Sequence, residues 1–215
     1  MAALANVPLK TAIERLGLPG IMIGHRIISP GDECALMPEE ALGFISSVAK
    51  VRRASSAARI VARELLSRAG YGTCAVPKGP SGAPIWPPGI VGSLAHDSQI
   101  AVAAVALQRN FASIGIDIEP AEALPAELVE IVATPTERSS MQTYPYGGRL
   151  LFVAKEATYK AVAALDQTFL DHHDVEIDLA QLKAVVRNGR SVDLRFCISI
   201  HLLALAFIPG TCPVQ

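Results

Sequence analysis

The sequence predicts an α+β fold, in which strands occur in neighbouring runs and a few long helices stand between them. Short apolar stretches follow one another at 90–95, 100–107 and 113–119, as expected for consecutive strands. Two longer segments, 54–69 and about 149–164, are expected to be helices. This grouping differs from the regular strand–helix alternation of a parallel sheet.

The first elements have clear start and stop signals. Residues 21–28 are mostly apolar and predict a strand that ends before Pro30. Pro38 precedes two acidic residues, as at the beginning of a helix. Gly70 follows the helical pattern of residues 54–69 and marks its end.

A loop is expected between this helix and the run of strands, because residues 77–90 hold five of the fifteen prolines and three glycines. The stretch 100–107 is rich in alanine, so its composition leaves both a strand and a helix open.

The last part of the chain predicts a short helix near 126–133 and a hairpin around Asn188-Gly189, the strongest short hairpin signal available. A final strand is expected at 202–208.

Composition excludes several classes of protein. The chain has 215 residues, of which 51% are apolar and 18% charged, which is enough for one well-packed domain. Its formal net charge of −1 argues against a nucleic-acid binder that depends on overall positive charge. No window of about 18 residues is apolar without a charge or a breaker, so we expect no membrane span. With no signal-peptide pattern and four scattered cysteines, we expect reduced thiols and a cytoplasmic location. We also expect the protein to be a monomer.

Two carboxylates share one face of the strand predicted at 113–119. Alternate side chains of a strand point to the same face, so Asp117 and Glu119 lie about 7 Å apart, opposite a row of isoleucines. Like charges at this spacing repel unless a cation or a shared proton intervenes, and oxygen ligands suit Mg²⁺. Taken alone, the pair is more simply explained as two solvent-facing acids.

The helix expected at 149–164 carries a second charged group. Glu156 and Lys160 are four residues apart and share a face, while Lys155 lies about 100° around the axis. A surface ion pair is the simple explanation, but the apolar neighbours favour partial burial. Glu156 could act as a third metal ligand or as a general base, and Lys160 could neutralise a leaving phosphate.

Other polar groups are less informative by themselves. His96 follows a predicted strand and, alone, is more often a structural histidine. The arginines around residues 52–68 form the most basic region of the chain, which is most simply a solvated helix face. Residues 171–174 hold two histidines and two aspartates without metal-ligand spacing, so we expect a loop there.

Three blocks in order resemble the signatures of the larger, single-chain 4′-phosphopantetheinyl transferases, most closely the branch that serves enterobactin-like siderophore synthetases. The family patterns are Gly-Ser-x-x-His, Gly-(Ile/Val)-Asp-(Ile/Val)-Glu and Phe-Ser-x-Lys-Glu-x-x-x-Lys, and a Pro-x-Trp-Pro segment precedes the first. The similarity covers about residues 35–165, with Val153 in place of the serine of the third pattern. The matching stretches are 92–96, 114–119, 152–160 and 84–87.

The resemblance implies one domain over 1–215, built as a pseudo-dimer of two similar α/β halves, approximately 1–111 and 112–215, with the active site between them. It also implies a Mg²⁺-dependent enzyme, a holo-[acyl-carrier-protein] synthase. Such an enzyme transfers the 4′-phosphopantetheine arm of coenzyme A to a serine of an apo acyl or peptidyl carrier protein and releases adenosine 3′,5′-bisphosphate. The pathway would be siderophore, nonribosomal peptide, polyketide or fatty-acid synthesis.

By the family pattern, Asp117, Glu119 and Glu156 would hold Mg²⁺. Glu156, or a water near it, would take the proton of the carrier serine, and Lys160 would stabilise the departing phosphate. Lys78 could replace a basic residue that many relatives carry where this chain has Ala83. The implied coenzyme A contacts are Arg52, Arg53, Arg59, Lys78, Ser93, His96, Asp117, Lys155 and Lys160.

Two other functions use the same residues. A metal-dependent phosphohydrolase would act with water alone, whereas a transferase needs a carrier protein. A non-catalytic coenzyme-binding module would have less reason to keep three carboxylates and both lysines.

Overall fold

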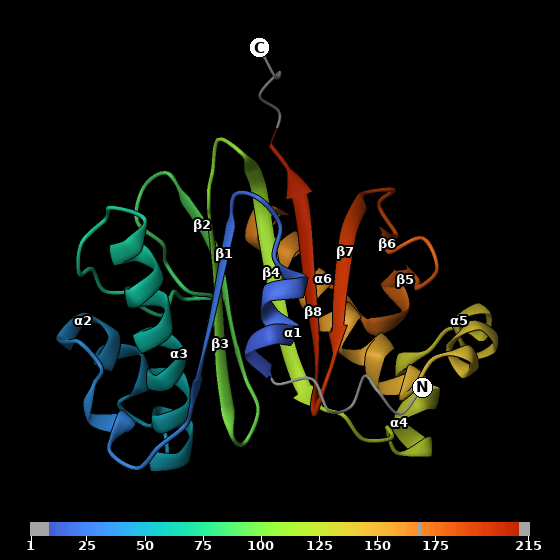
Figure 1. The fold of residues 1–215 in the computed structure, drawn as a ribbon, viewed down its shortest axis with the longest axis horizontal. Coiled ribbons are helices and arrows are strands. Elements are labelled where there is room, and N and C mark those ends of the chain that lie inside the picture. The colour runs from blue at the N-terminus through green and yellow to red at the C-terminus, as the bar shows by residue number, and fades with distance from the viewer. Residues whose placement is uncertain (1–8, 167–168, 211–215) are drawn as a thin grey trace.

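The computed structural model describes residues 9–166 and 169–210, which form two antiparallel sheets with helices packed against them (Figure 1). The α+β class is therefore confirmed. The first sheet contains β1 (Ile21–Ile27), β2 (Ile90–His96) and β3 (Ile100–Leu107). The second contains β4 (Phe111–Pro120), β5 (Val175–Asp178), β6 (Lys183–Val186), β7 (Ser191–Ile198) and β8 (His201–Pro209). The helices are α1 (Leu9–Leu16), α2 (Pro38–Ala41), α3 (Ala49–Arg68), α4 (Ala126–Val132), α5 (Pro135–Ser140) and α6 (Gly147–Asp166).

The two sheets repeat one topology. In the first, β1 leads into the long helix α3 and then into β2 and β3, and β3 pairs antiparallel with both earlier strands. In the second, β4 leads into the long helix α6, and the last strand, β8, pairs antiparallel with β4 and β7. The hairpin of β5 and β6 extends the second sheet beyond β7. This repeat is the pseudo-dimer arrangement that the resemblance implied.

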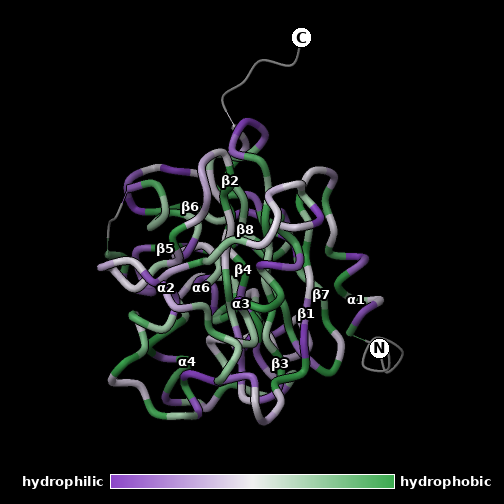
Figure 2. The backbone as a smooth tube through the Cα atoms, turned by 90° about the vertical axis from the view of Figure 1, so that its left-hand side faces the viewer, coloured by the Kyte–Doolittle hydropathy of each residue, from purple (hydrophilic) through white to green (hydrophobic). Residues whose placement is uncertain are grey.

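Each long helix covers the outer face of its own sheet, and the inner faces of the two sheets meet in a central core (Figure 1). The isoleucines of β4 point into this core, together with residues of β3 and β8 and the apolar face of α1. Figure 2 colours each residue by its hydropathy: the strands in the middle of the molecule are mostly hydrophobic, and several of the outer turns are hydrophilic.

The alanine-rich stretch is a strand because it lies in the middle of its sheet and is buried on both faces. Ala101 and Ala103 face α3, while Val102 and Ala104 face the central core. Small side chains let the helix and the second sheet approach this strand from both sides.

Most boundaries follow the sequence prediction, with a few differences. The helix after Pro38 is a single turn, continued by a 3₁₀ turn at Leu42–Phe44. Helix α3 begins five residues earlier than expected and ends before Gly70, whose φ of 88° suits only glycine well. The elements α1, α5 and β5 were not predicted. None of the described helices is long and apolar enough to cross a membrane.

Close packing of β4 on α6 depends on Gly115. A methyl group at this position would overlap the Ala157 carbonyl oxygen and would lie 2.8 Å from the Ala161 amide nitrogen. Both atoms belong to the backbone of α6, so a change of side-chain rotamer cannot relieve the clash. The absence of a side chain at Gly115 therefore sets how near Asp117 and Glu119 come to α6.

We predict that Gly115→Ala lowers the free energy of unfolding by about 3 kcal/mol or more, because the added carbon forces the helix away from the strand. Urea denaturation measures this change. Gly148→Ala is the matched control, because its new methyl group would meet only side chains, at 3.2 Å or more. Its stability should stay within about 1 kcal/mol of the parent. Equal stability of the two variants would contradict the packing argument.

Candidate active site

At the centre of the candidate site, α6 contacts the outer face of β4. The Lys160 ammonium donates a hydrogen bond to Asp117 Oδ1 at 2.6 Å and another to the Ile116 carbonyl at 3.2 Å. Asp117 is buried because it lies on the face of β4 that α6 covers. Burial raises the pKa of the Asp117 carboxyl, and the Lys160 ammonium opposes that rise. The second and third sequence motifs therefore meet.

Glu119 lies two residues further along the same face and is half-buried. Arg149, from the first turn of α6, donates a hydrogen bond to Glu119 Oε2 at 3.1 Å and also lies 3.5 Å from Glu122. Burial is the main cause that raises the pKa of Glu119, and the charge of Asp117 adds to it, against the effect of Arg149. No sequence signal singled out Arg149.

Glu156 is half-buried on α6, one turn before Lys160. Burial, followed by the charge of Asp117, raises the pKa of the Glu156 carboxyl. Lys160 and His172 act in the opposite direction. A raised pKa makes the Glu156 carboxylate a stronger base than an exposed glutamate.

The three carboxylates influence one another's pKa values but do not form a complete metal site. Asp117 raises the pKa values of both Glu119 and Glu156. Among residues 9–166 and 169–210, however, no three His, Cys, Asp or Glu side chains lie close enough together to hold an ion. Asp117 bonds to Lys160 and Glu119 bonds to Arg149 instead.

The first motif lies where the two sheets meet. Ser93 is buried, and its Oγ accepts a hydrogen bond from the Ile116 amide at 3.0 Å, which links β2 to β4. His96 is exposed at the end of β2. Loss of water around its ring lowers the pKa of His96, and the Lys160 ammonium lowers it further. The charges of Lys160 and Asp117 both act on the pKa of His96, so its ring lies near them.

Two residues that sequence reasoning did not assign join the halves beside His96. Asp97 accepts hydrogen bonds from the backbone amides of Gln99 and Ile100, and its other oxygen lies 2.9 Å from His201 Nε2. Both side chains are only 5% exposed. The contact connects the β2–β3 turn with the β7–β8 turn, its counterpart in the second half.

Lys155 differs from expectation. Its side chain is only 1% exposed, and its ammonium lies 2.8 Å from Glu137 Oε2 and donates to the His172 carbonyl at 2.8 Å. A lysine one residue from Glu156 points about 100° away around the helix, here into the interior. This ammonium is buried and paired with protein groups, while the side chain also lines the cavity beside Glu156, and the contact of Lys155 with coenzyme A stays a prediction.

The arginines of α3 fall into two groups. Arg53 holds Glu33 with two hydrogen bonds, of 2.7 and 3.0 Å, and lowers the pKa of Glu33 to about 2. Arg52 has a buried Nε atom with no hydrogen-bond partner among the described residues. Arg53 bonds to Glu33, and five residues before Glu33 the Ile28 amide donates a hydrogen bond to the Gln99 carbonyl in the turn that follows His96. This end of α3 therefore lies near that turn.

Arg59 and Lys78 meet at one aromatic ring. Arg59 is buried, donates to the Val76 carbonyl at 2.8 Å and lies 4.7 Å from the centre of the Phe44 ring. The exposed Lys78 lies 5.4 Å from the same ring. The two cations therefore form a second basic group, apart from Arg52 and Arg53.

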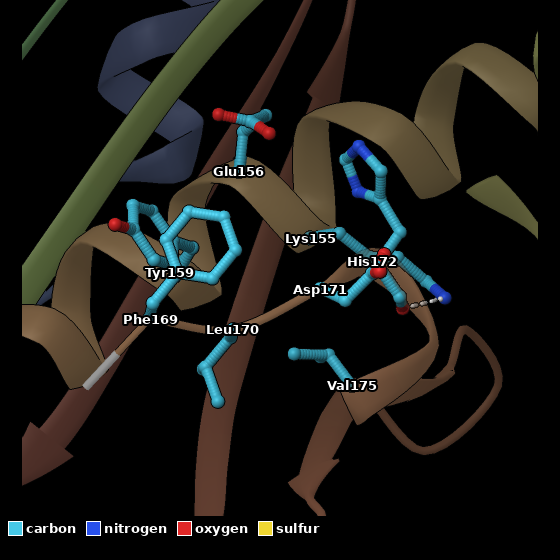
Figure 3. Close-up of a pocket in the computed structure, with 8 residues that line it drawn as sticks. All are labelled: Lys155, Glu156, Tyr159, Phe169, Leu170, Asp171, His172 and Val175. Atoms are coloured by element: carbon cyan, nitrogen blue, oxygen red, sulfur yellow. Dashed lines mark hydrogen bonds between the residues drawn. The ribbon is translucent and has the colours of Figure 1, made fainter. Parts of the chain in front are cut away.

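A cavity of about 290 Å³ opens beside Glu156, between α6 and the segment 169–175 (Figure 3). The rings of Tyr159 and Phe169 meet edge to face at its apolar end, with centres 6.3 Å apart. The residues that line it are Lys155, Glu156, Tyr159, Phe169, Leu170, Asp171, His172 and Val175. The expected loop at 171–174 is a 3₁₀ turn, His172–Asp174, and its role in this wall was not predicted.

Comparison with known proteins agrees with the motifs. Two protein-family models match the sequence. The family model of the 4′-phosphopantetheinyl transferase N-terminal domain matches residues 38–106, and the family model of the 4′-phosphopantetheinyl transferase superfamily matches residues 113–204. The 4′-phosphopantetheinyl transferase Npt of Nocardia iowensis is 41% identical over 168 residues, which cover 77% of this chain and 75% of that protein. The transferase PptT of Mycobacterium tuberculosis is 39% identical over 66% of this chain and 64% of that protein.

Identity to enterobactin synthase component D of Salmonella typhimurium is lower, 35% over 54% of this chain and 51% of that protein. Among solved structures, the holo-[acyl-carrier-protein] synthase of Thermotoga maritima aligns with a TM-score of 0.35 and 20% identity, over 45% of this chain and 62% of that chain. On the family models and the relatives together, the chain belongs to the 4′-phosphopantetheinyl transferase family.

Proposed function

We propose that the protein transfers the 4′-phosphopantetheine arm of coenzyme A to a serine of an apo acyl or peptidyl carrier protein and releases adenosine 3′,5′-bisphosphate. One observation carries the proposal: β4 and α6 bring Asp117, Glu156 and Lys160 into a single half-buried site, next to His96. A siderophore, nonribosomal peptide, polyketide or fatty-acid pathway would supply the carrier.

The chemistry of the donor set suits Mg²⁺, although the three side chains do not converge on one point among the described residues. Asp117, Glu119 and Glu156 offer only carboxylate oxygens, the ligands of a hard cation, and each has a raised pKa that a nearby positive charge would lower. When bound, the ion would neutralise charge on the pyrophosphate of coenzyme A. Two of the three carboxylates bond to a cation of the protein itself, Asp117 to Lys160 and Glu119 to Arg149.

The reaction then depends on how the protein positions its acidic and basic side chains against the two substrates. The Glu156 carboxylate takes the proton from the carrier serine hydroxyl, whose oxygen attacks the phosphorus that bears the pantetheine. The bond from that phosphorus to the oxygen of the adenosine-side phosphate breaks. Lys160 faces the negative charge that develops on this leaving group. No covalent enzyme intermediate is needed.

The cavity beside Glu156 suits the pantetheine arm. Tyr159, Phe169 and Leu170 supply apolar walls, and Asp171 and His172 supply polar groups. On the other side of the site, the guanidinium of Arg52, whose buried Nε has no hydrogen-bond partner among the described residues, supplies a positive charge for the 3′-phosphate of coenzyme A.

We predict that Asp117→Asn and Glu156→Gln each reduce transfer by about a hundredfold or more, because each removes charge where the phosphoryl group reacts. Mass spectrometry of apo acyl and peptidyl carriers, incubated with coenzyme A and Mg²⁺, measures the added arm. Glu64→Gln removes an exposed carboxylate of α3 and should transfer as the parent does. Hydrolysis of coenzyme A without a modified carrier would instead identify a phosphohydrolase.

We predict that Glu156→Gln increases stability at neutral pH. A carboxyl whose folded pKa lies above its ordinary value of about 4.5 binds more protons when folded, so it loses stability as pH rises from that value through the raised pKa. The urea midpoint of Glu156→Gln should therefore exceed that of the parent at pH 7, and the difference should disappear near pH 4. A lower midpoint for Glu156→Gln than for the parent at pH 7 would contradict the argument.

We predict that Arg52→Ala raises the KM for coenzyme A about tenfold and leaves the KM for 3′-dephospho-coenzyme A nearly unchanged, because only the first donor carries the 3′-phosphate. Steady-state kinetics with both donors test this. Arg68→Ala, in the last turn of α3, is the control. Equal effects on the two donors would exclude a 3′-phosphate contact at Arg52.

A further inference from the structure

Lys155 and Glu137 form the most deeply buried ion pair of the described residues, with each side chain only 1% exposed. Taking two charges out of water costs several kcal/mol per ion, and their attraction repays this only when further hydrogen bonds satisfy both groups. Burial lowers the pKa of Lys155, and Glu137 opposes that fall. Such a pair is a weak source of stability, which raises the question of what it holds in place.

The pair ties three segments together. From Lys155 on α6, the ammonium reaches both Glu137 on α5 and the His172 carbonyl, each at 2.8 Å. Glu137 in turn accepts the Ile177 amide at 2.7 Å and the Thr134 amide at 2.8 Å. Both ends of 172–177 are therefore attached, one to the lysine and the other to the glutamate.

This segment continues the wall of the cavity beside Glu156. Figure 3 shows Lys155 reaching across to the His172 carbonyl, while Phe169, Leu170 and Val175 lie around the cavity. Apolar packing of Val175 and Ile177 in the core beneath α6 also joins this wall to the helix, as do two ring contacts, Phe152 with His172 and Tyr159 with Phe169. Such ring contacts tolerate a change in separation, whereas a hydrogen bond of 2.8 Å does not.

We propose that Lys155 and Glu137 are positioning residues that fix the distance between the 169–177 wall and α6, and so set the affinity of the cavity for the pantetheine arm. The proposal rests on the proposed function in that it takes the arm to occupy this cavity. Neither residue touches the reacting atoms: the ammonium that the sequence motif offered for coenzyme A holds protein backbone instead.

The double variant Glu137→Gln/Lys155→Met tests the proposal, because it removes both charges together and leaves no buried ion without a partner. Calorimetric titration compares the dissociation constants of coenzyme A and of adenosine 3′,5′-bisphosphate, which lacks the arm. We expect coenzyme A to bind about tenfold more weakly and the bisphosphate to bind unchanged, since a loosened wall costs binding energy only where the arm lies. Amide exchange should accelerate in 172–177 and stay unchanged in α3.

Lys183→Met/Asp193→Asn is the matched control. It removes an ion pair of the same charges from β6 and β7, where both side chains are partly exposed and neither lines the cavity. Its affinities for both ligands should equal those of the parent. If the first double variant does not fold, Glu137→Asp keeps the charge but retracts it by one methylene group. That variant should weaken coenzyme A alone, by a smaller factor.

Unchanged affinity for coenzyme A in a folded Glu137→Gln/Lys155→Met protein would overturn the proposal, as would an equal loss for both ligands. These titrations need no carrier protein. If the parent binds coenzyme A through its arm but modifies no carrier, the proposed function fails while the positioning role still stands.

Discussion

The contact of β4 with α6 at Gly115 is the constraint on which the rest of the structure depends. The strand supplies Asp117 and Glu119, and the helix supplies Glu156 and Lys160. These residues act on one another only because the two backbones approach closely where a methyl group would meet the Ala157 carbonyl. The isoleucines on the other face of β4 pack in the core between the sheets and hold the strand in register. One strand therefore joins the two halves and carries the acids.

The site places three acidic side chains close together and partly out of water, which is electrostatically unfavourable. Burial and the charge of Asp117 raise the pKa values of Glu119 and Glu156, and the protein keeps the acids in place with two cations, Lys160 and Arg149. Such unfavourable placement of charge is common where groups must bind a ligand or exchange a proton. The raised pKa values of these acids would favour a divalent cation and would make Glu156 a stronger proton acceptor.

Sequence patterns predicted the strands that carry the motifs because alternation and turn residues are local properties. They did not predict α5, α1 or β5, which are short and owe their stability to packing against distant parts of the chain. Arg149, His172 and His201 were missed for the same reason: nothing in their neighbourhood along the chain shows that they lie beside Glu119, Glu156 and Asp97. The composition of the alanine-rich stretch 100–107 allowed both a strand and a helix, and its burial on both faces, which makes it a strand, depends on segments distant in the chain.

By itself, the sequence determined the fold class, the order of the motifs and the faces on which Asp117, Glu119, Glu156 and Lys160 lie, since strand and helix periods fix these directions locally. Only the tertiary structure decided which of the two lysines of the third motif bonds to Asp117. Lys160 faces Asp117, whereas Lys155, five residues earlier, meets the buried Glu137. That choice depends on what packs against each side of α6, and those partners come from segments distant in the chain.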